Sequence, residues 1–133
     1  MVEPTYKRSW EVPGGYVETG ESPPLHAAVR EVYEELGITP ALGRLLAVDW
    51  APSEAEGDKV LYLFDGGNLS SDDLAKITLQ QDELKAFAFV SMDEVAERTI
   101  PRLARRILAA AQARNDAAPV YLEHGQRPGT EAA

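Results

Sequence analysis

The stretch from Gly15 to Ile38, GYVETGESPPLHAAVREVYEELGI, decides how this chain is interpreted. Its second half predicts a helix from about Pro23 to Leu36. Ser22 is a suitable N-cap residue, and Pro23 suits the first helical position because its fixed φ is already helical. Gly37 predicts the end of the helix, since glycine readily takes the left-handed conformation that stops a helix.

The predicted helix has an apolar side and an acidic side. Apolar residues recur at helical spacing at Leu25, Val29, Val32 and Leu36. Glu31 and Glu35 lie one turn apart on a different face, with Glu34 beside them. Three carboxylates so near to one another repel unless a cation lies among them. A hard divalent ion such as Mg²⁺ prefers oxygen ligands, so the cluster is a candidate metal site.

The competing interpretation of the three glutamates is a solvated helix face, which is the usual place for such residues. No Lys or Arg follows any of them at four positions, so the chain offers no helix pair of that kind to explain them. On these residues alone, both interpretations stay open.

Composition narrows the class of protein. The chain has 133 residues, of which 44% are hydrophobic, and we expect one domain with one core. Its formal net charge of −9 opposes binding to a nucleic-acid backbone. It has no cysteine, which excludes disulfides and cysteine-ligated metals. The chain has no apolar run of ~20 residues, so we expect no membrane span. Its N-terminus lacks the apolar region of a signal peptide, so we expect a cytoplasmic protein.

The rest of the chain alternates strand-like and helical segments. We expect strands near 42–50, 60–64 and 85–90, short helices at 70–75 and 92–98, and a longer helix at 101–114. Trp10 and Val12 suggest the end of a first strand, and Tyr16-Val17 a brief second one. This order predicts an α/β domain over residues 1–122 around a small mixed sheet. The polar residues 123–133 are expected to form a flexible tail.

Three parts of the sequence together resemble the signature of the Nudix hydrolase family. They are Trp10–Gly15 (WEVPGG), Glu21 and Arg30–Ile38 (REVYEELGI). That signature reads Gly, five residues, Glu, seven residues, then Arg-Glu-apolar-any-Glu-Glu-any-Gly-apolar. The resemblance implies an α/β/α sandwich around a mixed sheet. It also implies an enzyme that uses Mg²⁺, with Mn²⁺ as a substitute, to hydrolyse a nucleoside diphosphate linked to another group X.

The chain departs from the family pattern in two places. Eight residues, not seven, separate Glu21 from Arg30. Family members also usually have two strands before the segment at Trp10, whereas only nine residues precede it here. We therefore expect a fold without its usual first strands. Our hypothesis is that a homodimer or strand exchange covers the apolar surface this would leave.

The resemblance also assigns roles to residues. The implied metal ligands are oxygen donors: the carboxylates of Glu31, Glu34 and Glu35 and the carbonyl of Gly14. Arg30 would orient the carboxylates in the catalytic site, with Glu21 as its partner behind the metal. Glu34 is implied as an auxiliary ligand or as the general base.

A second candidate for the catalytic base is Glu83, which lies just before the predicted strand at 85–90, with Asp82 as its local competitor. A solvated loop position is the alternative for either residue. Three aromatic residues, Trp50, Tyr62 and Phe64, could stack on a nucleobase, but their strand context favours core packing. The substrate-binding residues are otherwise unknown.

For several charged and polar residues on the two long helices, we expect a position on the protein surface rather than a functional role. His26 is expected on the protein surface near the start of the acidic helix. Arg102, Arg105 and Arg106 are expected on the wet face of the helix at 101–114.

Two other functions compete with hydrolysis. One is a Nudix-fold module that binds a nucleotide without turnover. The other is an acidic interaction domain without a ligand. An intact set of Arg30, Glu31, Glu34 and Glu35 favours the enzyme, since a pure binder has little need for all four.

Overall fold

The computed structural model describes residues 1–18, 20 and 23–129. The chain divides into two compact units. Unit 1 contains Met1–Gly43 and Gly66–Ser91, and unit 2 contains Arg44–Asp65 and Met92–Ala133. Among the helices described, none is long and apolar enough to cross a membrane.

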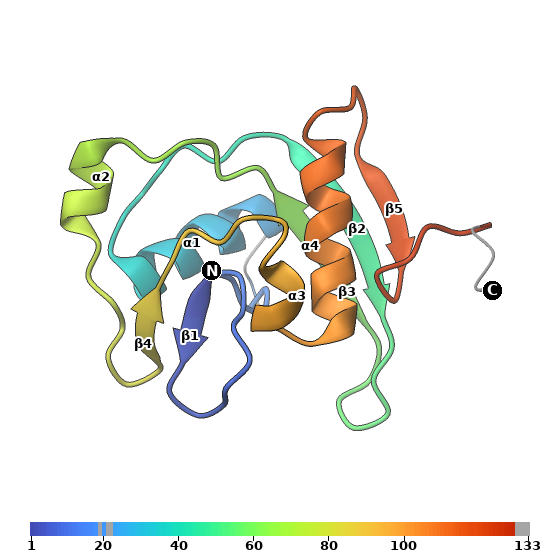
Figure 1. Ribbon diagram of the computed structural model, residues 1–133, viewed down its shortest axis with the longest axis horizontal. Coiled ribbons are helices and arrows are strands. Elements are labelled where there is room, and N and C mark those ends of the chain that lie inside the picture. Colours follow the sequence, from blue (N-terminus) through green and yellow to red (C-terminus); the bar gives the residue numbers. More distant parts are fainter. Residues whose placement is uncertain (19, 21–22, 130–133) are drawn as a thin grey trace. The chain divides into compact units, whose positions relative to one another are not determined.

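Unit 1 is built on a two-stranded antiparallel sheet and two helices (Figure 1). Strand β1 (Val2–Pro4) pairs with β4 (Leu84–Phe87), and the helices are α1 (Pro24–Leu36) and α2 (Ser71–Lys76). The buried centre of the unit consists of Val2, Leu36, Ile38 and Leu84. Helix α1 therefore contributes its C-terminal end to the core.

The predicted helix forms, with its start shifted by one residue. Pro23 occupies the N-cap position and Pro24 the first turn, because a proline at that point gives up no helical hydrogen bond. The predicted cap Ser22 lies outside the described residues. Gly37 ends the helix with φ of 72°, and its amide bonds to the Tyr33 carbonyl at 2.8 Å. The stop signal was predicted correctly.

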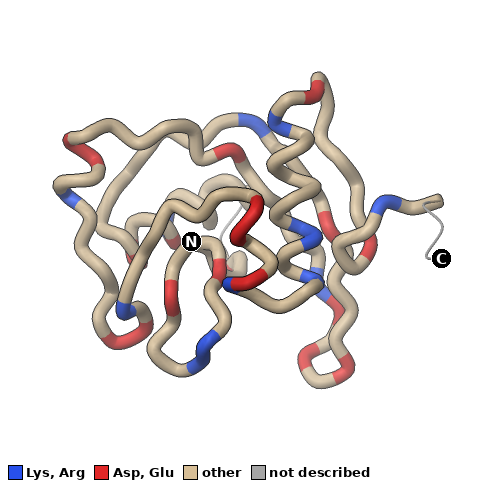
Figure 2. Tube along the Cα trace, in the orientation of Figure 1, with Lys and Arg blue, Asp and Glu red and all other residues tan. Residues whose placement is uncertain are grey.

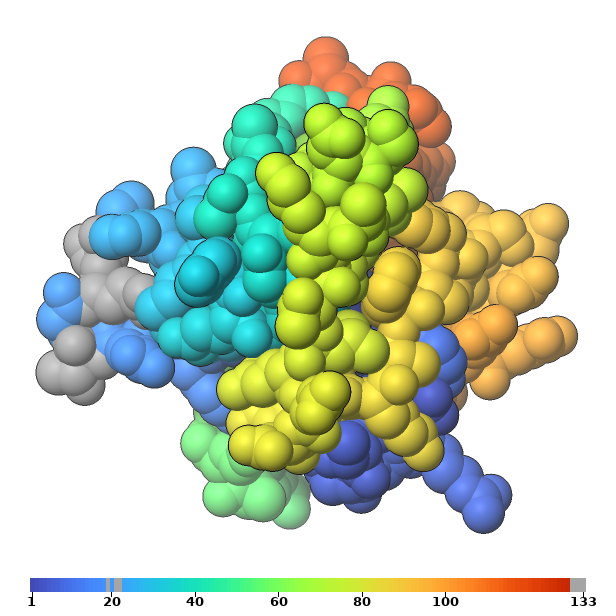
Figure 3. All heavy atoms as spheres, turned by 90° about the vertical axis from the view of Figure 1, so that its left-hand side faces the viewer, coloured from blue at the N-terminus to red at the C-terminus, as the bar shows by residue number. Residues whose placement is uncertain are grey.

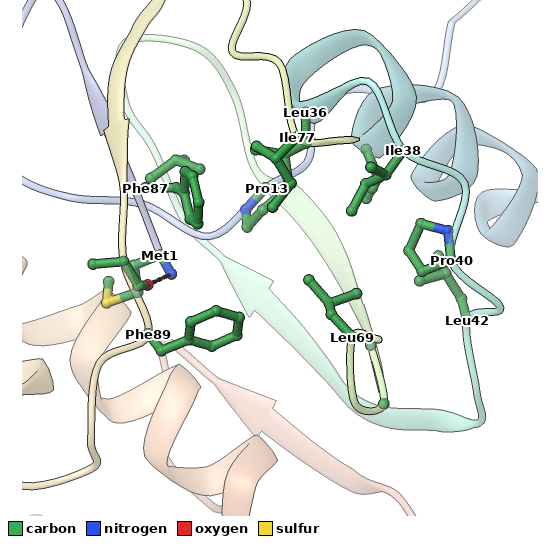
Figure 4. A pocket seen from close by; sticks show the side chains of 15 residues that line it. Met1, Pro13, Leu36, Ile38, Pro40, Leu42, Leu69, Ile77, Phe87 and Phe89 are labelled. Atoms are coloured by element: carbon green, nitrogen blue, oxygen red, sulfur yellow. Dashed lines mark hydrogen bonds between the residues drawn. The ribbon is translucent and has the colours of Figure 1, made fainter. Parts of the chain in front are cut away.

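The predicted apolar stripe of α1 is only partly buried. Leu36 is 7% exposed and Val32 packs against the same core, whereas Leu25, at the other end of the stripe, is 37% exposed. The C-terminal half of the stripe, Val32 and Leu36, lines a cavity of about 220 Å³ in unit 1, together with residues such as Ile38 and Leu69 (Figure 4). The apolar side of α1 therefore faces the interior of unit 1.

A segment after α2 binds the end of α1. The amide of Thr78 donates to the Leu36 carbonyl at 2.9 Å, and that of Gln80 donates to the Glu35 carbonyl at 3.0 Å. Figure 3 shows α2 and the residues after it, in yellow-green, beside the end of α1 and the following residues, in cyan. These bonds satisfy carbonyls that the helix end leaves unpaired. They also bring the approach to β4 close to the acidic side of α1.

Unit 2 is a three-stranded sheet with a helix on one face (Figure 1). Its elements are β2 (Leu45–Ala51), β3 (Lys59–Phe64), α3 (Val95–Arg98), α4 (Pro101–Ala113) and β5 (Val120–Glu123). Strand β2 is central, antiparallel to β3 and parallel to β5. Its core joins sheet and helix through Leu46, Ala47, Ala110 and Leu122. This sheet is mixed, as predicted, whereas β1 and β4 form a separate antiparallel pair in unit 1.

Several predicted strand boundaries were wrong. Strand β2 starts at Leu45 rather than 42, and β4 ends at Phe87 rather than 90. Residues 16–17 form no strand, and the predicted strand end near Trp10 is a single bridge between Glu11 and Val2. Strand β1, at residues 2–4, takes its place because it finds β4 as a partner. These differences reflect pairing across the chain, which local patterns do not contain.

A buried ion pair corrects the prediction for helix α4. Asp49 of β2 is fully buried, and Arg106, expected on the wet face, is 8% exposed. The Arg106 Nε donates to the Asp49 carboxylate, and the amide of Gly125 donates to its other oxygen at 3.0 Å. Arg102 is exposed as predicted, and Figure 2 shows basic residues at several points along α4. A charge that would cost much in isolation is thus fully partnered.

Candidate metal and catalytic site

The Gly14-Gly15 turn lies directly against the acidic side of α1. The amide of Gly14 donates to the Glu35 Oε1 at 3.4 Å. A Cβ atom built on Gly15 would lie 2.5 Å from the Glu31 carboxylate. Only glycine therefore allows this approach of backbone to carboxylate. The two residues that the sequence places one turn apart both face this turn.

Glu35 is the most perturbed acid described in unit 1. The residue is only 8% exposed. Its pKa is raised from 4.5 to about 7: burial is the largest cause, the hydrogen bond from Gly14 opposes it, and the charges of Glu31, Glu11 and Glu83 add to the rise. A buried carboxylate with acidic neighbours is stabilised in its ionised form by a cation.

Glu31 shares this environment to a smaller degree. Burial raises its pKa above the ordinary value, and the neighbouring acids Glu34 and Glu18 act in the same direction. The positive charge and hydrogen bond of Arg30 oppose the rise. Glu31 thus combines a partly buried carboxylate with an adjacent guanidinium.

The guanidinium of Arg30 contacts several oxygen acceptors. Its Nη1 lies 3.0 Å from both Glu31 and Glu34 and 3.5 Å from Glu18. Its Nη2 donates to the Tyr16 carbonyl at 3.1 Å, which ties the helix to the glycine turn. Arg30 and Glu34 are four residues apart and form an ion pair along the helix. The expectation from the sequence considered only basic residues that follow the glutamates, and it therefore missed this pair. Glu34 is 47% exposed on this side.

Glu83 lies close enough to the acidic group for its charge to contribute to the raised pKa of Glu35. The backbone holds Glu83 just before β4, where its carbonyl accepts from the Thr5 amide at 2.8 Å. Glu83 therefore stays a candidate for the catalytic base.

The donor types at this turn suit a hard divalent cation. Glu31 and Glu35 supply two carboxylates beside the Gly14 backbone, and oxygen donors of this kind are what Mg²⁺ prefers. Within the described part of the chain, no three His, Cys, Asp or Glu side chains are grouped closely enough to hold a metal. The predicted partner Glu21 lies outside the described residues.

The aromatic residues considered for stacking are more exposed than expected. Trp50 and Tyr62 are 39% and 46% exposed, so the expectation of core packing was wrong for both, while Phe64 is half-buried. Strand alternation places Trp50 on the face opposite Ala47 and Asp49, which pack toward α4. His26 is exposed, as expected.

Comparison with known proteins identifies the family. Residues 2–111 match the NUDIX domain, so the match covers most of the chain and spans both units. The chain belongs to the Nudix family, and its acidic helix α1 carries the signature that the sequence predicted.

Two curated relatives match shorter parts of the chain. An RNA pyrophosphohydrolase of Roseobacter denitrificans is 42% identical over 60 residues, which is 44% of this chain and 37% of the relative. A diphosphoinositol polyphosphate phosphohydrolase 3-alpha of Mus musculus is 58% identical over 43 residues, 32% of this chain and 26% of the relative. The chain thus spans about a quarter to a third of the length of these relatives.

Two solved structures share the fold over longer stretches. A MutT protein from Methanosarcina mazei Go1 superimposes with a TM-score of 0.66 at 25% identity, covering 88% of this chain and 83% of that one. A UDP-X diphosphatase superimposes with a TM-score of 0.66 at 22% identity, covering 91% and 58%. The predicted Nudix-like α/β fold is confirmed by these matches.

Proposed function

We propose that this protein hydrolyses the phosphoanhydride of a nucleoside diphosphate linked to another group X, with Mg²⁺ as its cofactor and Mn²⁺ as a substitute. One observation carries the proposal. The glycine turn contacts both Glu31 and the buried Glu35, and burial, together with acidic neighbours, raises the pKa of Glu35 to about 7. Such a group binds a divalent cation more readily than it accepts a second negative charge.

Each residue of the proposed site has its own role in the reaction. Glu31 and Glu35, with the Gly14 carbonyl, would hold the ion, which neutralises diphosphate charge and acidifies bound water. Arg30 keeps Glu31 and Glu34 oriented through charge-assisted hydrogen bonds. Glu34 or Glu83 would take the proton from the attacking water. The Glu34 side chain is more exposed than that of Glu31 and is therefore accessible to that water.

Family membership supports the class of reaction, and the relatives supply the substrates to test. A phosphate-release panel should cover ADP-ribose-like compounds, nucleoside triphosphates, dinucleoside polyphosphates and nucleotide sugars, with Mg²⁺ and with Mn²⁺. RNA and diphosphoinositol polyphosphates belong on the panel because the names of two relatives contain them. We expect release from at least one class, abolished by chelation of the metal.

Two variants test the assigned residues. Glu34→Gln or Glu35→Gln should reduce hydrolysis by at least ~100-fold, as expected for losing a base or a metal ligand. Glu97→Gln makes the same change of charge at an exposed residue of α3 in unit 2 and should leave the rate unchanged. Wild-type rates in both site variants would overturn the assignment. Nucleotide binding without release from any class would favour the binding module instead.

We also retain homodimerisation as a proposal. Phe89 is 72% exposed at the rim of the apolar cavity of unit 1, and large exposed aromatic side chains often mark an interface. Light scattering decides the matter, since a monomeric mass at micromolar concentration would contradict it.

A further inference from the structure

The small sheet of unit 1 has one covered edge and one open edge. On the β1 side, the Val2 amide donates to the Glu11 carbonyl at 2.8 Å, and the Glu11 amide donates to the Val2 carbonyl at 2.9 Å. On the β4 side, the described part of the chain supplies no further strand (Figure 1). A sheet of only two strands is marginally stable in water, and a third strand stabilises it. The outer edge of β4 is therefore a place where another strand can add.

The hydrogen-bond pattern of this sheet shows which backbone groups of β4 face outward. Val2 lies opposite Phe87, but both backbone groups of Val2 bond to Glu11, so this pair exchanges no hydrogen bonds. The next residue, Ala88, donates its amide to the Met1 carbonyl at 2.9 Å. Bonded and non-bonded pairs alternate in an antiparallel ladder, so the N–H and C=O of Phe87 point away from β1. These two groups are available to a strand that adds at the open edge.

Apolar side chains are exposed along the same strand and just after it. Phe87 is 40% exposed and Phe89 is 72% exposed, whereas Ala86 and Ala88 between and beside them are less exposed. Both rings line the apolar cavity of unit 1 (Figure 4). Exposed aromatic residues beside an open sheet edge are typical of an interaction surface.

The open edge is complementary to a second copy of itself. When two β4 strands pair in antiparallel about a twofold axis at Phe87, the outward N–H and C=O of one Phe87 bond to those of the partner's Phe87. The two rings then lie on one face, where aromatic cross-strand pairs are stabilising. In this register Lys85 lies opposite the partner's Phe89, a favourable cation–aromatic pair, so the two Lys85 ammonium groups do not face each other.

We propose that β4 is a dimerisation edge, at which two copies of this chain join β4 to β4 in antiparallel, with Phe87 at the twofold axis. The open backbone edge and the two exposed phenylalanines carry this inference. Each copy contributes one short strand and two aromatic rings, less than the ~800 Å² per partner of a stable interface, so the dimer is reversible and forms in the micromolar range. This assigns a surface to the proposed homodimer and does not depend on the proposed hydrolysis.

The absence of cysteine from the sequence allows a direct test of the register. Phe87→Cys places a thiol at the twofold axis, where the two Cα atoms of a bonded pair lie ~5.5 Å apart and a disulfide can form. Lys85→Cys is the matched control, because its two copies would be separated by roughly 14 Å, too far for a disulfide. Under mild oxidation of folded protein, we expect ~10-fold more cross-linked dimer from Phe87→Cys than from Lys85→Cys.

Sedimentation velocity on the full chain tests the contact without a cross-link. The mass of wild type should rise from monomer toward dimer as the concentration passes through the micromolar range. Phe89→Glu places a charge in the contact and should raise the dissociation constant at least ~10-fold. Tyr62→Glu makes the same change at a 46% exposed aromatic residue of β3, in unit 2, and should leave the dissociation constant unchanged. Circular dichroism establishes that each variant is folded.

The other outcomes decide against the proposal. A monomeric wild type across this range, with no cross-linking in Phe87→Cys, overturns the dimer and favours a strand of another protein at the open edge. Equal cross-linking from the two cysteine variants overturns the pairing about Phe87. If Phe87→Cys does not fold, equal dissociation constants for Phe89→Glu and Tyr62→Glu overturn the role of the β4 edge. A protein that dimerises as described but hydrolyses nothing on the phosphate panel refutes the proposed function alone.

Discussion

The backbone of Gly15 passes so close to the Glu31 carboxylate that a Cβ atom on Gly15 would lie 2.5 Å from it. A side chain at Gly15 and the observed position of Glu31 are therefore incompatible. The contact gives a reason for glycine at position 15 while Glu31 keeps this position. It also links the shape of the turn to the position of a proposed metal ligand.

Gly15→Ala should displace Glu31 and weaken metal binding. We expect at least a ~10-fold loss of metal-dependent hydrolysis, as is usual when a metal ligand is misplaced. Gly66→Ala is the control, because a Cβ there meets no described atom within 4 Å. Mn²⁺ titration followed by electron paramagnetic resonance measures the affinity directly. Equal affinities in the two variants would contradict the role of this contact.

The metal-free protein should lose stability as pH rises from about 4.5 to about 7. The folded pKa of Glu35 is raised to about 7, above its ordinary value of 4.5, chiefly by burial. The folded state keeps a proton that the unfolded state has already lost, so raising the pH favours unfolding across this window. The effect is on the order of 2–3 kcal/mol, and urea unfolding in chelator at several pH values measures it.

Glu35→Gln should remove this pH dependence, because the amide does not titrate. The variant should match wild type near pH 4.5 and exceed it in stability at pH 8 without metal. Mg²⁺ should stabilise wild type more at pH 8 than at pH 5.5, since the ligand binds only when ionised. Parallel stability curves for the two proteins would count against the raised pKa.

Arg30→Lys tests whether Arg30 acts through the geometry of its guanidinium or only through its positive charge. Arg30 holds Glu31 and Glu34 at 3.0 Å each, and a lysine cannot reproduce this planar fork. We expect kcat to fall ~10-fold while the protein keeps its melting temperature. Arg98→Lys, in the pair with Glu94, serves as the control. Wild-type kcat in Arg30→Lys would mean that only the positive charge matters.

Asp49→Ala should destabilise unit 2 strongly. The change leaves the buried Arg106 without its counter-charge and removes the acceptor of the Gly125 amide. Breaking a buried pair in this way typically costs ~3–5 kcal/mol. Urea unfolding followed by circular dichroism gives the free energy of unfolding. Lys85→Ala, which breaks the more exposed pair with Glu3, should shift the transition little, and equal effects would refute the prediction.

The sequence by itself determined the parts of this protein whose causes are local. The Gly37 stop, the acidic face with Glu31 and Glu35, and the capping box at Ser70 of α2 follow from residues within one or two turns of each other. For the same reason, the Nudix signature was readable before any fold was known. Such features depend on spacing along the chain, which a sequence contains in full.

The tertiary structure decided what depends on distant neighbours. Glu35 is buried because the glycine turn and the segment around Gln80 pack against it, so its raised pKa is not visible in the helix pattern. Glu83 lies far from Glu35 in the sequence, and the backbone path to β4 brings its charge near Glu35.

Unit 2 shows the same dependence on residues that are distant in the sequence. Arg106 has the spacing of a surface arginine, but pairing of β5 with β2 closes the core around Asp49 and makes the arginine its buried partner. Strand β5 has only four residues, too few for a pattern, and its stability comes from the sheet it joins. Burial and long-range pairing are sums over contacts far apart in the chain, so they emerge only when the chain has folded.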